Sequence, residues 1–172
     1  MAGVVESQLE GREQSGHVVV PTGYPDTLPD RLPAPAQIEV WEGGHPEPTA
    51  KSVRAGRRLL RTADEAGPND LVLVLVSGGG TALATVPAGS LDVEAVAHTS
   101  RRLLRSGVPI QEINMVRKHL TAVGGGQLAQ AARPADVAGL VVSDVVGDDL
   151  SSIASGPTVP DPSTYADAMR IL

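Results

Sequence analysis

The sequence predicts an α/β fold, a three-layer sandwich with a mostly parallel sheet and helices on both faces. Two aliphatic runs of strand length occur at residues 71–76 and 137–142. Amphipathic segments of helical length lie between and around these runs, and glycine or proline residues separate the segments. Strands that alternate with helices indicate βαβ units, which build parallel sheets.

The composition is that of one globular domain with an aliphatic core. The chain has 172 residues, 41% of them hydrophobic, with no Phe, one Trp and two Tyr. A net charge of −6 disfavours a nucleic-acid-binding or anionic-membrane surface, which needs excess positive potential. The absence of Cys excludes disulfides, thiolate metal sites and Cys nucleophiles. With no apolar run of membrane-helix length and no signal pattern, we expect a soluble, cytoplasmic protein.

The first third of the chain predicts two short strands and two helices. Residues 1–9 have the pattern of the end of an amphipathic helix, and 17–20 and 38–42 read as strands. Four prolines within 24–35 predict an irregular surface loop. Residues 49–66 form an amphipathic helix with Thr49 as its N-cap. Its arginines are expected to form a solvated face, since a basic stripe alone is weak support for a phosphate or nucleic-acid site.

The remaining elements follow from periodicity and from helix-end signals. The continuous apolar run 71–76 is typical of a strand buried on both faces of a parallel sheet. A helix over 92–106 should begin at Asp92 and end at a left-handed Gly107. Further helices are expected over 110–120, over 127–132 and from 163 onward, and a strand over 137–142.

Polar, glycine-rich loops follow the two most apolar strands, where ligands bind in such sheets. The first loop is Ser77, Gly78, Gly79, Gly80 and Thr81. Consecutive glycines can turn their N–H groups toward one anion, and a helix starting at Thr81 would add to that attraction. The alternative is a tight strand-to-helix turn packed closely on its neighbour. The loop matches neither GxxxxGK[ST] nor GxGxxG, and the GxSxG nucleophile order is absent.

Two further groups carry charge. Arg117 and Lys118 lie in one predicted helix, where Arg offers a planar fork for carboxylate or phosphate and Lys a compact charge for a phosphoryl group. Asp144 follows the second strand, with Asp148 and Asp149 close behind, and such carboxylates can hold Mg²⁺ or act as a base. The alternatives are exposed charges on an amphipathic helix and turn-capping aspartates. Together, an anion nest, cations and carboxylates are the groups that phosphoryl transfer requires.

Several long motifs resemble the glycerate 2-kinase family. These are LVLVLVSGGGTAL, NMVRKHLTAVGGGQLA and LVVSDVVGDDLSSIASGPTVPDPSTYADA, with EVWEGGHPEP before the first long helix. The resemblance covers most of the chain from about residue 17 to its end. It implies a Rossmann-like N-terminal domain that pairs with a C-terminal MOFRL domain. It also implies an enzyme that phosphorylates D-glycerate at the 2-hydroxyl with ATP and a divalent cation, expected to be Mg²⁺.

The resemblance places particular residues in the cleft between the two domains, and we assign their individual roles. Catalysis is expected from Asp144 and Lys118, and metal binding from Asp144 and Asp149. Substrate binding is expected from Ser77, Gly78, Gly79, Gly80, Thr81, Arg117, Glu42 and His45. In one division of roles the loop and Arg117 hold glycerate's carboxylate while Asp144 orients or deprotonates the hydroxyl. In the other the loop holds ATP phosphates and Asp144 serves Mg²⁺; the first is favoured because no Lys follows the glycines.

The chain also departs from the family pattern. The family has Lys-Gly-Gly where this chain has Gly124, Gly125 and Gly126, and Arg where it has Gln127. It begins with a further strand and a Gly-Lys motif, and it continues into the MOFRL domain. We therefore expect residues 1–172 to be an incomplete kinase domain with little activity alone. The alternative is a non-catalytic phospho-ligand-binding or interaction module, and a homodimer remains open.

Overall fold

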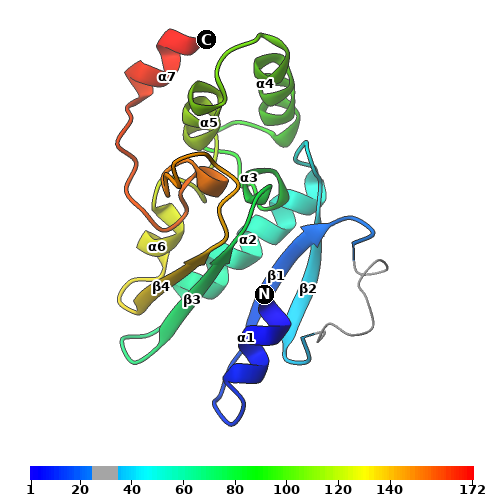
Figure 1. Ribbon diagram of the computed structural model, residues 1–172, viewed down its shortest axis with the longest axis vertical. Helices are drawn as coiled ribbons and strands as arrows, with labels where there is room; N and C mark the ends of the chain where they lie inside the picture. The colour runs from blue at the N-terminus through cyan, green and yellow to red at the C-terminus, as the bar shows by residue number, and fades with distance from the viewer. Residues whose placement is uncertain (25–34) are drawn as a thin grey trace.

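The computed structural model describes residues 1–24 and 35–172 (Figure 1). Most of the proline-rich loop expected over 24–35 lies outside these residues. The described chain contains four strands, β1 (Gly16–Pro21), β2 (Ile38–Gly43), β3 (Leu71–Val76) and β4 (Asp136–Val141). The helices are α1 (Ala2–Gln8), α2 (Ala50–Asp64), α3 (Gly80–Leu83), α4 (Val93–Arg105), α5 (Ile110–His119), α6 (Gln127–Ala131) and α7 (Tyr165–Ile171), with a 3₁₀ turn η2 (Ile153–Ser155).

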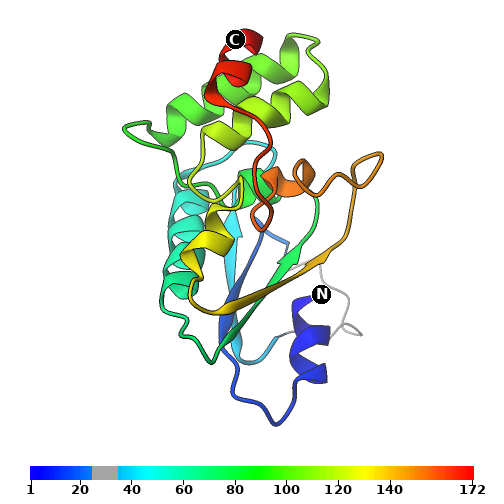
Figure 2. The same ribbon diagram turned by 90° about the vertical axis from the view of Figure 1, so that its left-hand side faces the viewer.

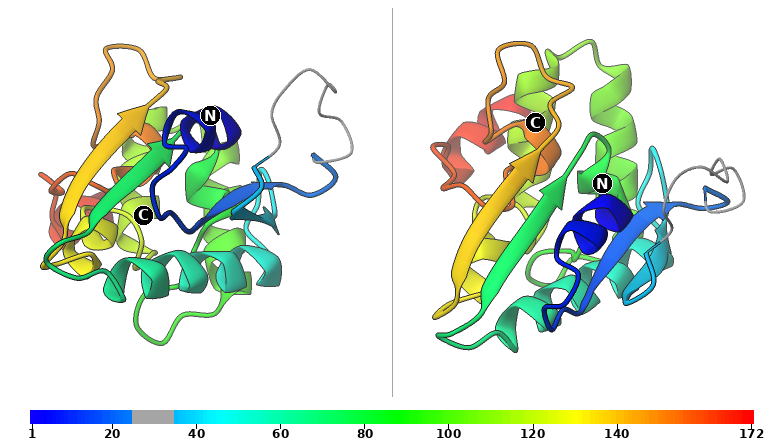
Figure 3. Two further views of the ribbon diagram at one scale, coloured as in Figure 1. Left: turned by 90° about the horizontal axis from the view of Figure 1, so that it is seen from below. Right: turned by 60° about the horizontal axis from the view of Figure 1, so that its bottom comes forward.

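The strands confirm the α/β class and the parallel direction. β1 pairs with β2 in parallel, from Gly16↔Ile38 to Pro21↔Gly43, and β3 pairs with β4 in parallel, from Leu71↔Asp136 onward. Within the described residues these are two separate two-stranded sheets rather than the one sheet that was expected. The four strands nevertheless lie in one row, in the order β4, β3, β1, β2 (Figures 1 and 3).

Helix α2 joins the two strand pairs from one face. It leads from β2 to β3, and its Leu59, Leu60 and Ala63 pack with Val72 and Val74 of β3. The same cluster takes in Val123, Leu128, Ala132 and Val137. Helix α1 lies on the opposite face of the strands from α2 (Figure 3). Helices therefore lie on both faces, as expected.

A second apolar cluster joins three helices beyond the glycine-rich ends of the strands. Leu103 of α4, Ile113 and Val116 of α5 and Ala168 of α7 are buried together. These helices form a separate layer at the end where the strand arrows point (Figure 2). The C-terminal segment from η2 onward runs alongside this layer, which brings it to the edge where the site was predicted.

The predicted helix ends are confirmed where local chemistry determines them. Asp92 Oδ1 accepts a hydrogen bond of 2.7 Å from Ala95 N and caps α4. Gly107 has φ +78°, the left-handed conformation expected just after that helix. At the start of α2 the Ser52 hydroxyl accepts hydrogen bonds from the backbone N–H groups of Thr49 and Gly44.

The burial predicted for strand β3 is wrong. Of its six residues only Val76 is buried, and Leu71 is 65% exposed. Val72 and Val74 pack toward α2 as expected. Since side chains alternate along a strand, Leu71, Leu73 and Leu75 point to the other face, which the described residues cover only in part. One apolar face of the pair is thus left open.

Candidate functional site

The glycine loop after β3 is shaped by three close approaches. The carboxylate of Asp144 contacts Gly78 so closely that a Cβ there would overlap it. The ring of His45 would lie 2.7 Å from a Cβ on Gly79, and Ala154 Cβ the same distance from one on Gly80. Packing against Ala154 disfavours a side chain at Gly80, and the positive φ of Gly79 disfavours one there, while a Cβ on Gly78 would displace the exposed Asp144 carboxylate; these approaches favour the tight-turn interpretation. The side chains that approach include two predicted site residues, Asp144 and His45, so the loop brings them together.

The backbone of the loop suits this role. Gly79 has φ +82° and precedes α3, which is a single turn of helix from Gly80 to Leu83. The predicted helix at Thr81 is thus present but short, and its dipole adds little to any attraction for an anion. Ser77 and Gly78 are exposed at the strand end, where a ligand has access. The anion nest itself stays a prediction.

The turn η2 connects this loop to a second glycine triplet. The hydroxyls of Thr81 and Ser155 are 2.9 Å apart, within hydrogen-bond distance. On the other side the N–H of Gly125 donates to Ser155 O and that of Gly126 to Gly156 O, both at 2.8 Å. Ala154 and Ser155 have φ +48° and +64°, a conformation that is unfavourable for residues with a Cβ. Packing from both triplets holds this strained turn in place.

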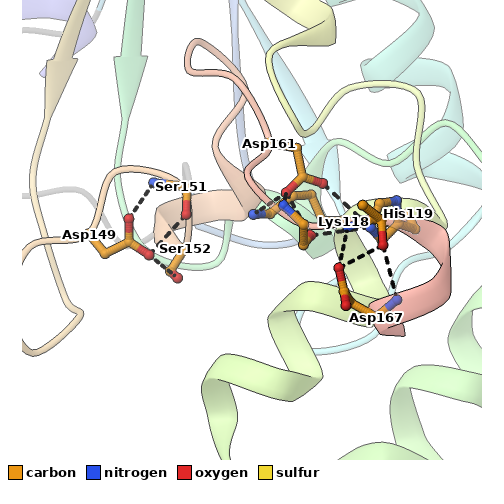
Figure 4. Close-up of polar contacts among 9 residues, drawn as sticks. Lys118, His119, Asp149, Ser151, Ser152, Asp161 and Asp167 are labelled. Atoms are coloured by element: carbon orange, nitrogen blue, oxygen red, sulfur yellow. Dashed lines mark hydrogen bonds and ion pairs between the residues drawn. The ribbon is translucent and has the colours of Figure 1, made fainter. Parts of the chain in front are cut away.

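Asp144 and Asp149 have different surroundings. Asp144 is exposed, and among the described residues no hydrogen bond or ion pair is made by its carboxylate. Asp149 accepts hydrogen bonds from Ser151 N, Ser151 Oγ and Ser152 Oγ at 3.0, 2.9 and 2.6 Å (Figure 4). These bonds, chiefly that from the Ser152 hydroxyl, lower the pKa of Asp149. Asp149 therefore caps a turn, whereas Asp144 is available for a ligand.

Lys118 lies in an ion pair away from solvent. Its side chain is 5% exposed, and Nζ lies 3.1 Å from Asp161 Oδ1, while His119 Nε2 lies 3.5 Å from Asp161 Oδ2. Figure 4 shows this cluster apart from the Asp149 cluster. Burial acts to raise the pKa of Asp161, but hydrogen bonds from Ser163 and Lys118 outweigh it and hold that pKa below its ordinary value. The Lys118 charge is thus already balanced inside the protein.

Arg117, one residue earlier, is in the opposite situation. Its side chain is half-buried, and within the described part of the chain it has no hydrogen bond or ion pair. Burial lowers the pKa of its guanidinium. A desolvated cation without a partner gains free energy from an anionic ligand.

Glu42 holds a turn at the ends of β1 and β2. It accepts hydrogen bonds from Gly23 N at 2.9 Å and from Lys51 Nζ at 2.7 Å. The Gly23 bond is the main cause of the lowered pKa of Glu42. His45, in the loop after β2, contacts Gly79 instead and remains exposed. Of these two predicted substrate residues, only His45 reaches the glycine loop by a contact of its own.

Sequence reasoning did not single out two residues that organise this region. Ser155 links the two glycine triplets, and Asp161 is the partner of Lys118. Both lie in the motif SSIASGPTVPDP, which was noted as a whole but not residue by residue. A polar serine between two apolar small residues and an Asp between two prolines were the available signals.

A shallow pocket of about 360 Å³ lies where α5, the second glycine triplet and the start of α7 meet. It is lined by Lys118, His119, Gly125, Gln127, Asp161, Ser163, Thr164 and Tyr165. Its polar groups largely bond one another, as the contact of His119 with Ser163 at 3.2 Å illustrates. The pocket lining includes Lys118, one of the predicted catalytic residues, but none of the β3 loop residues.

A divalent cation would find one available carboxylate here. Within residues 1–24 and 35–172 no three His, Cys, Asp or Glu side chains are grouped as a metal site. Mg²⁺ needs only one or two protein oxygens when substrate phosphates and water supply the rest. The free carboxylate of Asp144 fits that requirement, and Asp149 fits it less well because of its serine bonds.

Among the described helices, none is long and apolar enough to cross a membrane.

The chain is similar to several named proteins. It is 46% identical over 135 residues to D-glycerate 2-kinase of Thermotoga maritima, covering 78% of this chain and 32% of the relative. It is 42% identical over all 172 residues to glycerate 2-kinase of Pyrococcus horikoshii, covering 37% of that protein. A protein of Agrobacterium vitis that is provisionally named a hydroxypyruvate reductase is 43% identical over all 172 residues, and the match covers 38% of its length.

The solved structures agree with this similarity. The crystal structure of glycerate kinase from Thermotoga maritima matches the whole of this chain with a TM-score of 0.88 and 40% sequence identity. The match covers 40% of the length of that protein. The chain thus spans well under half of the length of these relatives. A family model described as "Domain of unknown function (DUF4147)" matches residues 1–172. The chain belongs to the DUF4147 family, the N-terminal domain of glycerate kinases.

Proposed function

We propose that this chain provides one side of a glycerate 2-kinase site, where D-glycerate is phosphorylated to 2-phosphoglycerate by ATP. The observation that carries the proposal is the contact between Asp144 and Gly78. It places an unpaired carboxylate directly against the glycine loop at the strand end, where ligands bind in α/β folds. The kinase names of relatives at 42% and 46% identity support the same substrate.

In the proposed division of roles the glycerate carboxylate is held by the loop N–H groups and by Arg117. The guanidinium lacks a partner among the described residues and is desolvated, so an anion would satisfy it. His45, which lies against Gly79, is placed to contact the substrate from the side of β2. This arrangement needs no lysine after the glycines, in agreement with the sequence.

Asp144 is proposed to act on the 2-hydroxyl. It accepts the hydroxyl proton while the oxygen forms a bond to the γ-phosphorus of ATP, and the bond from that phosphorus to the β,γ-bridging oxygen breaks to release ADP. Mg²⁺, when bound, would neutralise charge on the phosphates; Asp149 is its candidate ligand in this division of roles, and Asp144 is the candidate ligand in the other division. Lys118 is not needed for this step, and its predicted catalytic role would require its release from Asp161.

A chimeric kinase tests the proposal. This chain replaces the matching part of the Thermotoga maritima D-glycerate 2-kinase, and ADP release is followed with D-glycerate and ATP. Asp144→Asn is expected to lower kcat by roughly 10²- to 10⁴-fold, the usual contribution of a general base. Asp148→Asn is the matched control, because Asp148 is exposed and makes no side-chain hydrogen bond in the described structure. Equal activity of both variants would refute the role of Asp144.

The same proteins and ligands distinguish the kinase from two other functions. A non-catalytic ligand-binding module predicts that the isolated chain binds D-glycerate or ATP in calorimetry while the chimera shows no transfer. A reductase predicts NAD(P)H oxidation with hydroxypyruvate. The loop after β3 lacks the GxGxxG spacing of dinucleotide-binding turns, which disfavours this second reaction.

A further inference from the structure

The turn η2 ends in three consecutive residues with a left-handed backbone. Ala154, Ser155 and Gly156 have φ angles of +48°, +64° and +58°. Glycine adopts this conformation readily, whereas in other residues the Cβ then lies too close to the following carbonyl oxygen. Only the third of these residues is glycine, so Ala154 and Ser155 hold a conformation that their own side chains oppose. Backbone strain of this kind persists where the surrounding structure imposes it, and it is concentrated at functional positions.

The backbone of the turn is held by the second glycine triplet. Gly125 N donates to Ser155 O, and Gly126 N donates to Gly156 O, both at 2.8 Å. These bonds involve only main-chain atoms of the turn, so glycines at positions 154 and 155 would make them equally well. The bonds therefore explain the shape of the turn, but they do not require an alanine and a serine within it.

The two side chains of the turn contact the glycine loop after β3. The Ala154 methyl lies 2.7 Å from the position that a Cβ on Gly80 would occupy. The Ser155 hydroxyl lies 2.9 Å from that of Thr81, the next residue of the loop. The turn lies beside α3, whose first residue is Gly80 (Figures 1 and 2). The two strained residues therefore contact two consecutive residues at the start of α3.

Gly80 and Ala154 are complementary in shape. Gly80 does not have a positive φ, so its backbone is compatible with alanine. Apart from the Ala154 methyl, the nearest atom to a Cβ on Gly80 would be Ala154 Cα, at an ordinary contact distance of 3.9 Å. The space between the two segments thus holds one methyl group. The strained residue carries that methyl group, and the loop residue has none.

Helix α3 depends on such contacts for its position. A single turn of helix has little stability of its own, because its first hydrogen bond fixes several residues. Ala82 N donates to Gly79 O at 3.0 Å within this turn. The backbone of Leu83 packs against Gly43 at the end of β2, and the contacts from η2 hold the start of the helix. Loss of the η2 contacts would therefore leave the glycine loop held mainly through Leu83.

We propose that Ala154 is a positioning residue for the glycine loop. Its left-handed backbone sets the direction of the methyl group, and the methyl group holds Gly80 so that the loop N–H groups keep one arrangement. The inference rests on the proposed function, in which these N–H groups hold the carboxylate of D-glycerate. Ala154 itself acts through Gly80 and not by contact with the substrate.

The variant Ala154→Gly in the chimeric kinase tests this role. It keeps the backbone bonds of η2 and relieves the strain, which offsets the lost methyl contact, so the urea midpoint of the isolated chain should change little. The kcat/KM for D-glycerate should fall at least about tenfold, chiefly through KM, because the loop no longer holds the carboxylate in place. A parallel fall in urea midpoint and activity would indicate a merely structural residue and overturn the proposal.

The matched control is Asp148→Gly. Asp148 also has a positive φ, of +53°, and its side chain is exposed. Glycine therefore relieves the same backbone strain there but removes no contact with Gly80. We expect this variant to keep the kcat/KM of the unmodified chimera. An equal loss of kcat/KM in both variants would overturn the role of the Ala154 methyl group.

A reciprocal pair tests the complementarity of the two residues. Gly80→Ala alone should lower the urea midpoint and kcat/KM, because its Cβ overlaps the Ala154 methyl. Adding Ala154→Gly should restore the urea midpoint to about the wild-type value, since the single methyl group is then supplied by residue 80. Additive losses in the double variant would overturn the proposed fit.

Amide exchange in the isolated chain distinguishes this inference from the kinase proposal. Ala154→Gly should speed exchange of the Ala82 amide by about tenfold or more, while the Gly125 and Gly126 amides, which bond the turn, should change little. Unchanged exchange at Ala82 would overturn the positioning role, whether or not the chimera is active. Faster exchange with an inactive unmodified chimera would support the positioning role and count against the kinase function alone. An active chimera whose kinetics are unchanged by Ala154→Gly would overturn the inference.

Discussion

The Asp144 carboxylate lies in direct contact with Gly78, with no space between them for a methyl group. The two residues come from the ends of the paired strands β3 and β4, whose register brings Val76 opposite Val141. This contact places the acidic group beside the glycine loop, so a change in either residue should affect ligand binding before it affects the fold.

Gly78→Ala should displace the Asp144 carboxylate. Gly78 does not have a positive φ, so alanine is compatible with its backbone, and the cost falls on the neighbouring side chain. In the chimeric kinase we expect kcat/KM for D-glycerate to fall by at least about tenfold, as for misplaced catalytic groups. Gly16→Ala is the control, because a Cβ at Gly16 meets nothing within 4 Å. Unchanged kinetics in both variants would show that the contact is unimportant.

Arg117→Gln should weaken glycerate binding without lowering stability. The guanidinium is desolvated and has no partner in the described structure, so its removal breaks no hydrogen bond. Loss of a charged contact to a carboxylate costs roughly 1.5–3 kcal/mol, or about 10- to 150-fold in affinity. Calorimetry with D-glycerate and urea unfolding measure the two effects. Arg57→Gln, on the exposed face of α2, should change neither, and a large loss of stability at Arg117 would instead indicate a structural role.

Lys118→Met should destabilise the fold. It leaves the partly buried Asp161 with its Ser163 bonds but without the Lys118 cation. Breaking one side of a buried ion pair costs about 3–5 kcal/mol. The double variant Lys118→Met, Asp161→Asn should recover part of that loss, because no unpaired charge remains. Urea unfolding of the wild type, Lys118→Met, Asp161→Asn and the double variant gives the coupling free energy between the two residues, and additive effects in the double variant would contradict the pairing.

Stability should fall on acidification through Asp161. Its folded-state pKa is held below the ordinary value by Ser163 and Lys118 against the effect of burial. A carboxyl with a lowered pKa stabilises the fold above its unfolded pKa, and that contribution is lost as pH falls through the folded value. The loss should therefore begin below about pH 5. Asp161→Asn should show a shallower decline in urea midpoint than wild type, whereas parallel curves would exclude this residue as a cause.

Thr81→Val should loosen the turn η2. The Thr81 hydroxyl lies 2.9 Å from that of Ser155, which is 1% exposed. Leaving a buried hydroxyl without its partner costs about 1–3 kcal/mol. Amide exchange of Gly125, which donates to Ser155 O, should accelerate with it. Thr158→Val serves as the control, since no hydrogen bond of its hydroxyl is found in the described chain; equal effects would contradict the proposed coupling.

The sequence predicted those features that depend on neighbouring residues. Asp92 caps α4 by accepting a hydrogen bond from an amide three residues away, and Gly107 follows the helix in a left-handed backbone conformation. Both features depend only on neighbouring residues and could be predicted from the sequence. The strand β3 was also found, but its burial depends on what lies at its free edge and on its second face. No local sequence pattern indicates what lies at that edge or on that face, and the expectation of a fully buried strand was therefore wrong.

The candidate site divides in the same way. The approach of Asp144 and His45 to the glycine loop agrees with the rule that strand ends meet at one edge. The ion pair of Lys118 with Asp161 and the hydroxyl contact of Thr81 with Ser155 join distant segments. A single sequence does not reveal which of many charged or hydroxyl groups pair across such separations. Lys118 was accordingly assigned to the site, while its buried partner was not noticed.

The pairing of β3 with β4 also has a consequence for synthesis on the ribosome. Leu71 pairs with Asp136, so α3 through α6 must all emerge before the first ladder bond between these strands can form. At about 5–20 residues per second, the aliphatic segment of β3 remains unpaired for several seconds in the growing chain. During this interval the exposed aliphatic segment is most prone to aggregation, and slower translation between the two strands would lengthen the interval.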